Sequence, residues 1–315
     1  MNKVLISFIV PVFNEEENIE RLYSELLKLT NRLEAHYDYE VIFTDNHSTD
    51  QTEAMLTQLA RTDKKVKVIR FSKNFGYQKS ILTGYLNASG DLAVQIDCDL
   101  QDPLELVPVF LQHWKEGYQV VYGIRRSRKE SWSINIIRKA FYYLIDKLSD
   151  ETIPRDAGDF RLVDRKILNQ LRKIKDEQPY LRGSIAAMGF NQIGVSYDRD
   201  ERLKGESKFS FGQLVGLAFD GILNHSLVPL RFASYVGLFV SIMTFMSLIG
   251  YLIGKVLGAD WPAGFATMTI LILLSLSLNA LFLGIIGEYL GRIYQQVKQK
   301  PLTIIEKQFN LDEEI

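Results

Sequence analysis

The segment Leu92-Ala93-Val94-Gln95-Ile96-Asp97-Cys98-Asp99-Leu100-Gln101-Asp102-Pro103 runs from apolar residues into a cluster of carboxylates. Its apolar part predicts a buried strand that ends near Ile96. Alternate residues of an extended chain point to the same face, so Asp97 and Asp99 can converge on one point. Such a pair suits a hard divalent cation, because Mg²⁺ is often held by one or two carboxylates together with substrate phosphates. The alternative is a polar turn after a strand, since Asp and Pro are common turn residues.

Strand-like and helix-like patterns alternate along the first part of the chain. Apolar segments rich in β-branched residues predict strands at 4–12, 40–44, 66–71, 92–96 and 120–123. Helical spacing of apolar residues predicts helices around 19–29, 55–59 and 81–87. This alternation predicts an α/β fold in which a mostly parallel sheet has helices on both faces. Ligands bind beyond the carboxyl ends of such strands, so we expect one cleft to collect the polar clusters at 14–16, 45–50 and 97–102.

The composition excludes some classes of function. The 315 residues carry a formal net charge of −1, so no overall positive field favours nucleic acid as a partner. The single cysteine, Cys98, rules out an intrachain disulfide and fits a reducing compartment. Without a second thiol or a nearby histidine, Cys98 is interpreted as a small strand residue that faces the sheet interior rather than as a ligand for a soft metal.

Two long segments in the last third of the chain contain no charged residue. They cover 232–254 and 263–287, and each is long enough to cross a hydrocarbon core of ~30 Å as a helix. A pair of buried core helices is the alternative. The short connection between them predicts a hairpin with both ends on one side of the membrane. Basic residues gather on that side, at Arg231, Arg292, Lys298 and Lys300. The positive-inside tendency then places the large N-terminal domain and the C-terminus in the cytoplasm.

The expected organisation therefore has four parts. They are a cytoplasmic catalytic domain over 1–209, an interfacial segment over 210–230, two spans within 231–291 and a cytoplasmic tail over 292–315. A basic amphipathic pattern at 132–148 predicts a helix that lies on the membrane surface or packs into the globular core. Glycines spaced four apart in the spans allow close helix packing, either within the hairpin or between copies in a homo-oligomer.

Four motifs occur in the order of a known family. They are Pro11-Val12-Phe13-Asn14-Glu15, Asp97-Cys98-Asp99-Leu100-Gln101-Asp102-Pro103, Gly158-Asp159-Phe160-Arg161-Leu162 and the segment from Arg202 through Gly205-Glu206-Ser207-Lys208-Phe209. With them the chain resembles family 2 glycosyltransferases of the GT-A fold. It is most similar to the polyprenyl-phosphate branch, which includes dolichol-phosphate mannose synthases and bacterial GtrB-type glucosyltransferases. The resemblance implies an inverting, Mg²⁺- or Mn²⁺-dependent hexosyltransferase of the bacterial inner membrane.

The resemblance also implies a donor site at the strand ends. Its nucleotide-sugar contacts would be Pro11, Phe13, Glu15, Asp45, Asn46, Asp97, Asp99 and Gln101. Asp99 would bind the metal directly, and Asp97 would contact the metal or the ribose. The chain departs from the family at Asn46, where many members carry a second aspartate. An asparagine still offers a donor and an acceptor to a nucleobase. UDP-glucose is the first expected donor, followed by other UDP sugars and GDP-mannose.

The acceptor site is expected around the third and fourth motifs. Asp159 would orient the acceptor or take its residual proton, Asp156 is the competitor, and Arg161 would stabilise charge. Either aspartate could instead cap the helix that begins near Asp164. Residues expected to bind an acceptor phosphate are Arg125, Arg128, Arg202, Ser207 and Lys208. A polyprenyl phosphate is already ionised at neutral pH, so its attack requires no strong general base.

Two other functions compete with this interpretation. One keeps the donor site but transfers the sugar to a hydroxyl group of a protein, a glycan or diacylglycerol, and that reaction needs a true general base. The other is a non-catalytic membrane scaffold that binds a nucleotide sugar. Membrane lipids are expected partners in every case.

Overall fold

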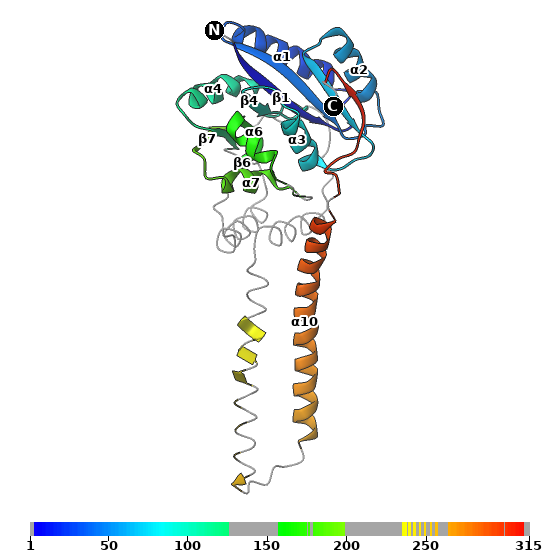
Figure 1. Ribbon diagram of the computed structural model, residues 1–315, viewed down its shortest axis with the longest axis vertical. Helices are drawn as coiled ribbons and strands as arrows, with labels where there is room; N and C mark the ends of the chain where they lie inside the picture. Colours follow the sequence, from blue (N-terminus) through cyan, green and yellow to red (C-terminus); the bar gives the residue numbers. More distant parts are fainter. Residues whose placement is uncertain are drawn as a thin grey trace. The chain divides into compact units, whose positions relative to one another are not determined.

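The computed structural model describes residues 3–125, 157–174, 176, 179–198, 264–298 and 300–311, with scattered positions between 235 and 257 (Figure 1). The chain divides into two compact units. The sheet unit comprises Met1–Lys139, Glu151–Lys208 and Gln299–Ile315, and the helical unit comprises Ala140–Asp150 and Phe209–Lys298. The stretch 126–156, just before the third motif, and the stretch 199–234, which contains the fourth motif, lie outside the described residues.

The sheet unit is built on a mixed sheet of eight strands in the order β7-β5-β6-β4-β1-β2-β3-β8. The strands are β1 Val4–Val12, β2 Tyr37–Asp45, β3 Val66–Phe71, β4 Leu92–Gln95, β5 Val120–Arg125, β6 Ala157–Asp164, β7 Gln192–Tyr197 and β8 Ile305–Phe309. Strands β1 to β4 pair in parallel, whereas β6 is antiparallel to both of its neighbours and β8 is antiparallel to β3. The strands predicted at 4–12 and 66–71 are confirmed with the same bounds.

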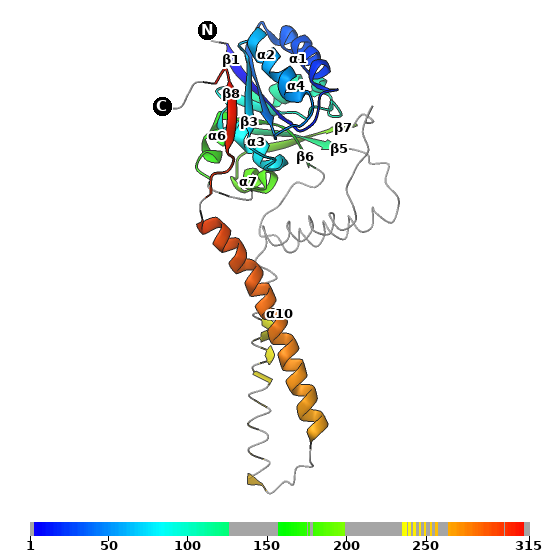
Figure 2. The same ribbon diagram turned by 90° about the vertical axis from the view of Figure 1, so that its right-hand side faces the viewer.

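Helices cover both faces of this sheet (Figure 2). One face carries α1 Ile19–Leu33, α2 Thr52–Thr62 and α4 Val107–Lys115, with the short helix η1 Leu104–Leu106, and the other carries α3 Tyr77–Leu86, α6 Arg165–Leu171 and α7 Leu181–Ala187. Alternate side chains of one strand enter the two cores, as shown by Phe8 and Val10 against Ile9. The predicted α/β architecture with helices on both faces is thus confirmed.

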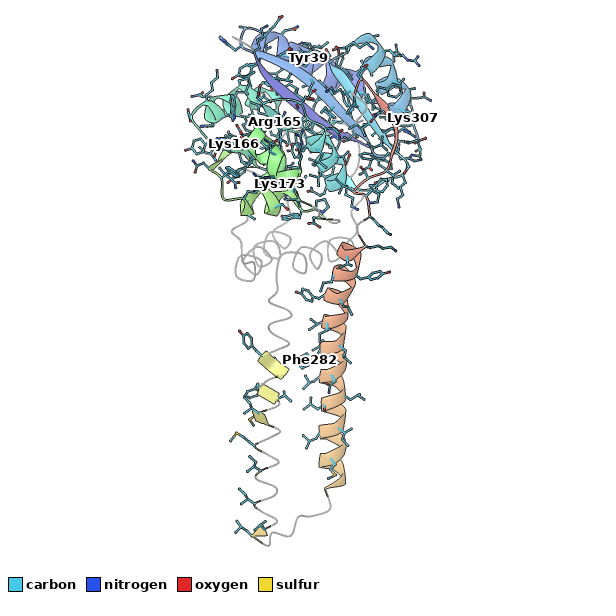
Figure 3. The ribbon with its side chains drawn as sticks, in the orientation of Figure 1. Tyr39, Arg165, Lys166, Lys173, Phe282 and Lys307 are labelled. Carbon is cyan, nitrogen blue, oxygen red and sulfur yellow. The ribbon has the colours of Figure 1, made fainter. Side chains whose placement is uncertain are left out.

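The helical unit contains the 33-residue helix α10, Phe265–Val297. Among the described residues it is the one helix that is long and apolar enough to cross a membrane, over Leu274–Gly291 with a mean hydropathy of 1.4. Large apolar side chains such as Leu274 and Leu283 are exposed. A Cβ atom at Gly237 would lie 3.8 Å from the Phe282 ring, so the chain at Gly237 passes beside α10 (Figure 3). The first predicted span, 232–254, is described only at scattered positions, so the two-span hairpin stays a prediction.

Candidate active site

Strands β4, β1 and β2 are neighbours that run in parallel, so their carboxyl ends meet at one edge of the sheet. The loop after each strand contains a non-glycine residue with a positive φ, Asn14 at 55°, His47 at 64° and Leu100 at 54°. Such a backbone is rare for leucine and costs about 1–3 kcal/mol, and it persists where the surrounding structure over-determines it, often at a functional site. The three loops that carry the predicted cleft residues thus follow neighbouring strands, and each loop contains one residue in an unusual backbone conformation.

The two candidate metal ligands follow β4. Asp97 accepts hydrogen bonds from the Tyr77 hydroxyl and, at 3.0 Å, from the Gln95 amide, while Asp99 accepts one from the Gln101 backbone at 3.2 Å. Burial raises the pKa of Asp97 to about 6, against the lowering effect of the Tyr77 hydrogen bond. The negative charges of neighbouring aspartates add to that rise. Electrostatics at this point therefore favour an added positive charge.

These residues fit a divalent cation that also binds substrate phosphates. Across the part of the chain that the structure describes, no three His, Cys, Asp or Glu side chains gather as a metal cage. Two carboxylates with room for phosphate oxygens are instead a typical arrangement for Mg²⁺. Among the described residues, the buried Gln101 Oε1 has no hydrogen-bond partner, so this turn holds an acceptor that a bound group could use. Cys98 is buried in the core, but it lies in the turn after β4, whereas the sequence predicted a strand residue. Burial raises the pKa of its thiol.

Hydrogen bonds join the loops after β1 and β2. The Asn14 backbone N–H donates to Ser48 Oγ at 2.9 Å, and the Thr49 N–H donates back to Asn14 Oδ1 at 2.8 Å. The Glu15 N–H donates to Thr52 Oγ1 at 2.9 Å, while the Glu15 carboxylate accepts from Asn18 at 2.6 Å. Of the first motif's predicted donor contacts, Pro11 is buried, and Phe13 is 45% exposed beside these loops.

Asp45 and Asn46 are engaged inside the protein. Asp45 has no exposed surface and accepts from Arg70 at 2.5 Å and from the Ser48 N–H at 2.9 Å. Asn46 is also buried, and its side-chain oxygen accepts from the Phe75 N–H at 2.8 Å. Both side chains hold loop backbone in this conformation, so direct contact with a nucleobase stays a prediction.

Asp159 forms a bidentate ion pair that sequence reasoning did not foresee. Arg182, at the start of α7, donates to its two carboxylate oxygens at 2.9 and 2.6 Å. Burial alone would raise the pKa of Asp159, but the hydrogen bonds and charge of Arg182 outweigh it, so this pKa lies below its ordinary value. Arg161 is buried, donates to the Gly158 carbonyl at 2.9 Å and lies 4.0 Å from Asp159. Its predicted role in stabilising charge during the reaction stays a prediction.

A second network joins Asp102, the third aspartate of the aspartate motif, to β5 and β7. The buried Asp102 accepts from the Tyr197 hydroxyl at 2.5 Å and from Arg125 at 3.3 Å, and Arg125 also donates to Tyr197 at 3.2 Å. Arg125 is thus engaged within the protein, and its contact with an acceptor phosphate stays a prediction. Tyr197 ends β7, a few residues before the motif that starts at Arg202, and sequence reasoning missed it.

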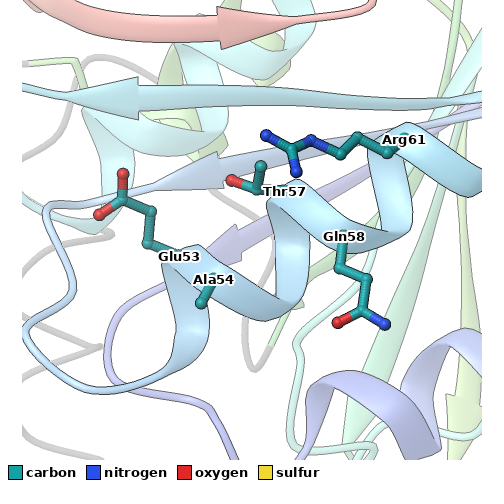
Figure 4. Close-up of a pocket in the computed structure, with 5 residues that line it drawn as sticks. All are labelled: Glu53, Ala54, Thr57, Gln58 and Arg61. Atoms are coloured by element: carbon teal, nitrogen blue, oxygen red, sulfur yellow. The ribbon is translucent and has the colours of Figure 1, made fainter.

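Several predicted acceptor residues cannot be placed. Asp156, Arg128, Arg202, Ser207 and Lys208 lie outside the described residues. A hollow on α2 is lined by Glu53, Ala54, Thr57, Gln58 and Arg61 (Figure 4). None of these five residues belongs to the strand-end loops.

Comparisons with known proteins define the class. The sequence model of glycosyl transferase family 2 matches residues 7–172, and the chain belongs to this family. Its α/β sheet with parallel central strands is the GT-A arrangement.

Relatives match nearly the whole chain. The uncharacterized glycosyltransferase YkcC of Bacillus subtilis is 38% identical over 97% of this chain and 94% of its own. The SfII prophage-derived bactoprenol glucosyl transferase of Shigella flexneri is 34% identical over 96% and 97%. Among solved structures, the mannosyltransferase PcManGT of Pyrobaculum calidifontis with GDP-Man and Mn²⁺ is 17% identical, with a TM-score of 0.44, over 92% of this chain and 88% of its own.

Proposed function

We propose that this protein transfers a sugar, glucose from UDP-glucose in the first place, to the phosphate of a polyprenyl phosphate with inversion at the anomeric carbon. Full-length relatives named bactoprenol glucosyl transferases support this acceptor. The exposed apolar helix α10 supports a membrane-bound enzyme that meets its lipid substrate at the bilayer surface. The proposal includes two spans and a cytoplasmic sheet unit on the strength of the two uncharged segments and the basic residues beside them.

The observation that carries the proposal is the Asp159–Arg182 ion pair. Transfer to a hydroxyl group is most efficient with a general base whose pKa lies near the working pH. Asp159 is the opposite, a carboxylate whose pKa is held below its ordinary value by a bidentate arginine. A phosphate oxygen is already ionised and attacks without such a base. The pair therefore favours a phosphate acceptor over a hydroxyl acceptor.

The chain's own residues then have distinct roles. Asp97 and Asp99 would hold Mg²⁺ or Mn²⁺, which when bound neutralises charge that develops on the departing diphosphate. The interlocked loops after β1 and β2 would receive the nucleoside, with the exposed Phe13 ring at their edge. Arg182, whose side chain is 30% exposed, would orient the acceptor phosphate beside Asp159 with the N–H groups that this ion pair does not use.

Replacing Asp159 with Asn tests the acceptor assignment. With undecaprenyl phosphate, we expect a fall in kcat of about tenfold or less and an unchanged pH profile between pH 6 and 8, because only orientation is lost; loss of a general base would cost about 10²–10⁴-fold. Asp38→Asn is the matched control, because Asp38 is half exposed at the opposite end of β2. A 10³-fold loss that depends steeply on pH would contradict the phosphate acceptor.

A further inference from the structure

The C-terminal segment returns to the sheet unit and completes its edge. Strand β8 runs antiparallel to β3, with Arg70 paired to Lys307 in the register, and Figure 2 shows β8 at this edge (Lys307 is labelled in Figure 3). The Ser72 N–H donates to the Ile304 carbonyl at 2.9 Å. Just beyond β8, the Asn310 amide donates to the Ala60 carbonyl at 2.6 Å and to a β3 carbonyl at 2.8 Å. The segment expected as a tail is thus a fixed part of the sheet unit.

Arg70 connects β8 to the loop after β2. Its side chain is only 8% exposed, and its guanidinium donates to Asp45 at 2.5 Å, to Glu306 of β8 at 3.1 Å and to the Ser48 carbonyl at 3.2 Å. Glu53 of α2 lies 3.4 Å from the same guanidinium and also accepts from Lys307 at 2.7 Å. One buried cation thus joins three carboxylates from three different elements.

These contacts hold the loop after β2 at two points, one a side chain and one a backbone carbonyl. Arg70 holds the carboxylate of Asp45 at one end and the carbonyl of Ser48 at the other, on either side of His47 with its positive φ. The hydroxyl of the same Ser48 accepts from the Asn14 N–H and so fixes the loop after β1. A rigid guanidinium fork suits this task, whereas a lysine offers only a point charge.

We propose that the C-terminal strand is a working part of the donor site, in which Glu306 acts through Arg70 to position the 45–50 loop for a nucleoside diphosphate. Arg70 and Glu306 are positioning residues, because they touch the loop rather than the ligand. The inference rests on the proposed function, which assigns the nucleoside to these loops. Since β8 follows α10 directly in the sequence, nucleotide binding then depends on the segment that leaves the apolar helix.

The test measures nucleotide binding by the full chain in detergent micelles, with UDP and GDP as probes in titration calorimetry and with melting temperatures recorded in parallel. We expect Glu306→Gln to weaken UDP binding about three- to tenfold, the size of a partly exposed charge-assisted contact. Arg70→Lys weakens it further, because the fork is lost. Glu306→Asp, which keeps the charge, recovers part of the affinity. Gln308→Ala is the matched control, since Gln308 is exposed on the same strand, and it leaves affinity unchanged.

The outcomes separate this inference from the function on which it rests. If the wild type binds UDP and the Glu306→Gln and Arg70→Lys variants bind it equally well, this inference alone is overturned. Variants that lose affinity only as far as their melting temperature falls, with no recovery in Glu306→Asp, also overturn it, because that pattern is merely structural. A wild-type protein that binds neither nucleotide overturns the proposed function and this inference together.

Discussion

Replacing Arg182 should leave the buried carboxylate of Asp159 without its main partner. In the wild type the Asp159 side chain is 10% exposed and the Arg182 side chain 30% exposed. Breaking a fully buried pair costs about 3–5 kcal/mol, and the partial exposure of Arg182 reduces this to about 2 kcal/mol for Arg182→Met. For a domain of this size, about 2 kcal/mol corresponds to a fall in melting temperature of about 4–8 °C.

The pH dependence of that loss carries the more specific prediction. In the wild type the pKa of Asp159 is lowered, so the pair stabilises the fold above the unfolded pKa of about 4 and is lost as pH falls through the folded pKa. In Arg182→Met the lowering effect of Arg182 is lost, so burial raises the pKa of Asp159. Ionisation of Asp159 then costs stability as pH rises. The difference in melting temperature between wild type and variant should therefore be larger at pH 7.5 than at pH 5.

Tryptophan fluorescence of the full chain in micelles measures both melting temperatures. Asp159→Asn combined with Arg182→Met should recover most of the loss, because no buried charge remains. Arg61→Met, at an exposed position on α2, is the control and should change little. An equal difference at both pH values, or a difference below about 1 °C, would refute the reasoning that Arg182 keeps Asp159 ionised.

Three other predictions follow from single contacts. Asp99→Asn and treatment with EDTA should each lower sugar transfer by about a hundredfold or more, with Mg²⁺ or Mn²⁺ restoring only the EDTA-treated wild type, and full activity in EDTA would exclude a metal role. Gly84→Val should destabilise the protein by about 1–3 kcal/mol, because even a Cβ there would lie 2.3 Å from Ile9 Cγ2; thermal melting measures the loss, and Ile9→Ala in the same chain should reduce it. Tyr197→Phe should cost about 1–3 kcal/mol, because the buried Asp102 loses its 2.5 Å hydroxyl donor, and an unchanged melting temperature would show that another group replaces it.

Local patterns were sufficient to predict the central parallel strands and the polar loops that follow their carboxyl ends. Short apolar runs rich in β-branched residues predicted β1 and β3 with their observed bounds, because parallel strands covered on both faces bury nearly every side chain. The alternation of strands and helices also predicted that the polar clusters follow the carboxyl ends of parallel strands, where ligands bind in such folds. The rest of the proposed donor site depends on the conformation of the loops after these strands, which the pattern of apolar residues does not determine.

The interactions that sequence reasoning missed join residues far apart along the chain. Arg182 and Asp159 are separated by 23 positions, Tyr197 and Asp102 by 95, and Arg70 and Glu306 by 236. No local spacing marks such pairs, and a charged residue taken singly reads as a surface charge. The edge strand β8 was missed because 305–309 is short and mixes charged and apolar residues, and its pairing with β3 is what makes it a strand.

The most direct test of the central claim is sugar transfer from labelled donors by purified full-length protein in lipid with Mg²⁺ or Mn²⁺. UDP-glucose, UDP-N-acetylglucosamine and GDP-mannose are offered with undecaprenyl phosphate, and undecaprenol and diacylglycerol serve as hydroxyl acceptors. The account predicts that label from one donor, UDP-glucose first, moves into the lipid phase only with undecaprenyl phosphate. Transfer to a hydroxyl acceptor, or no transfer from any donor, would contradict it.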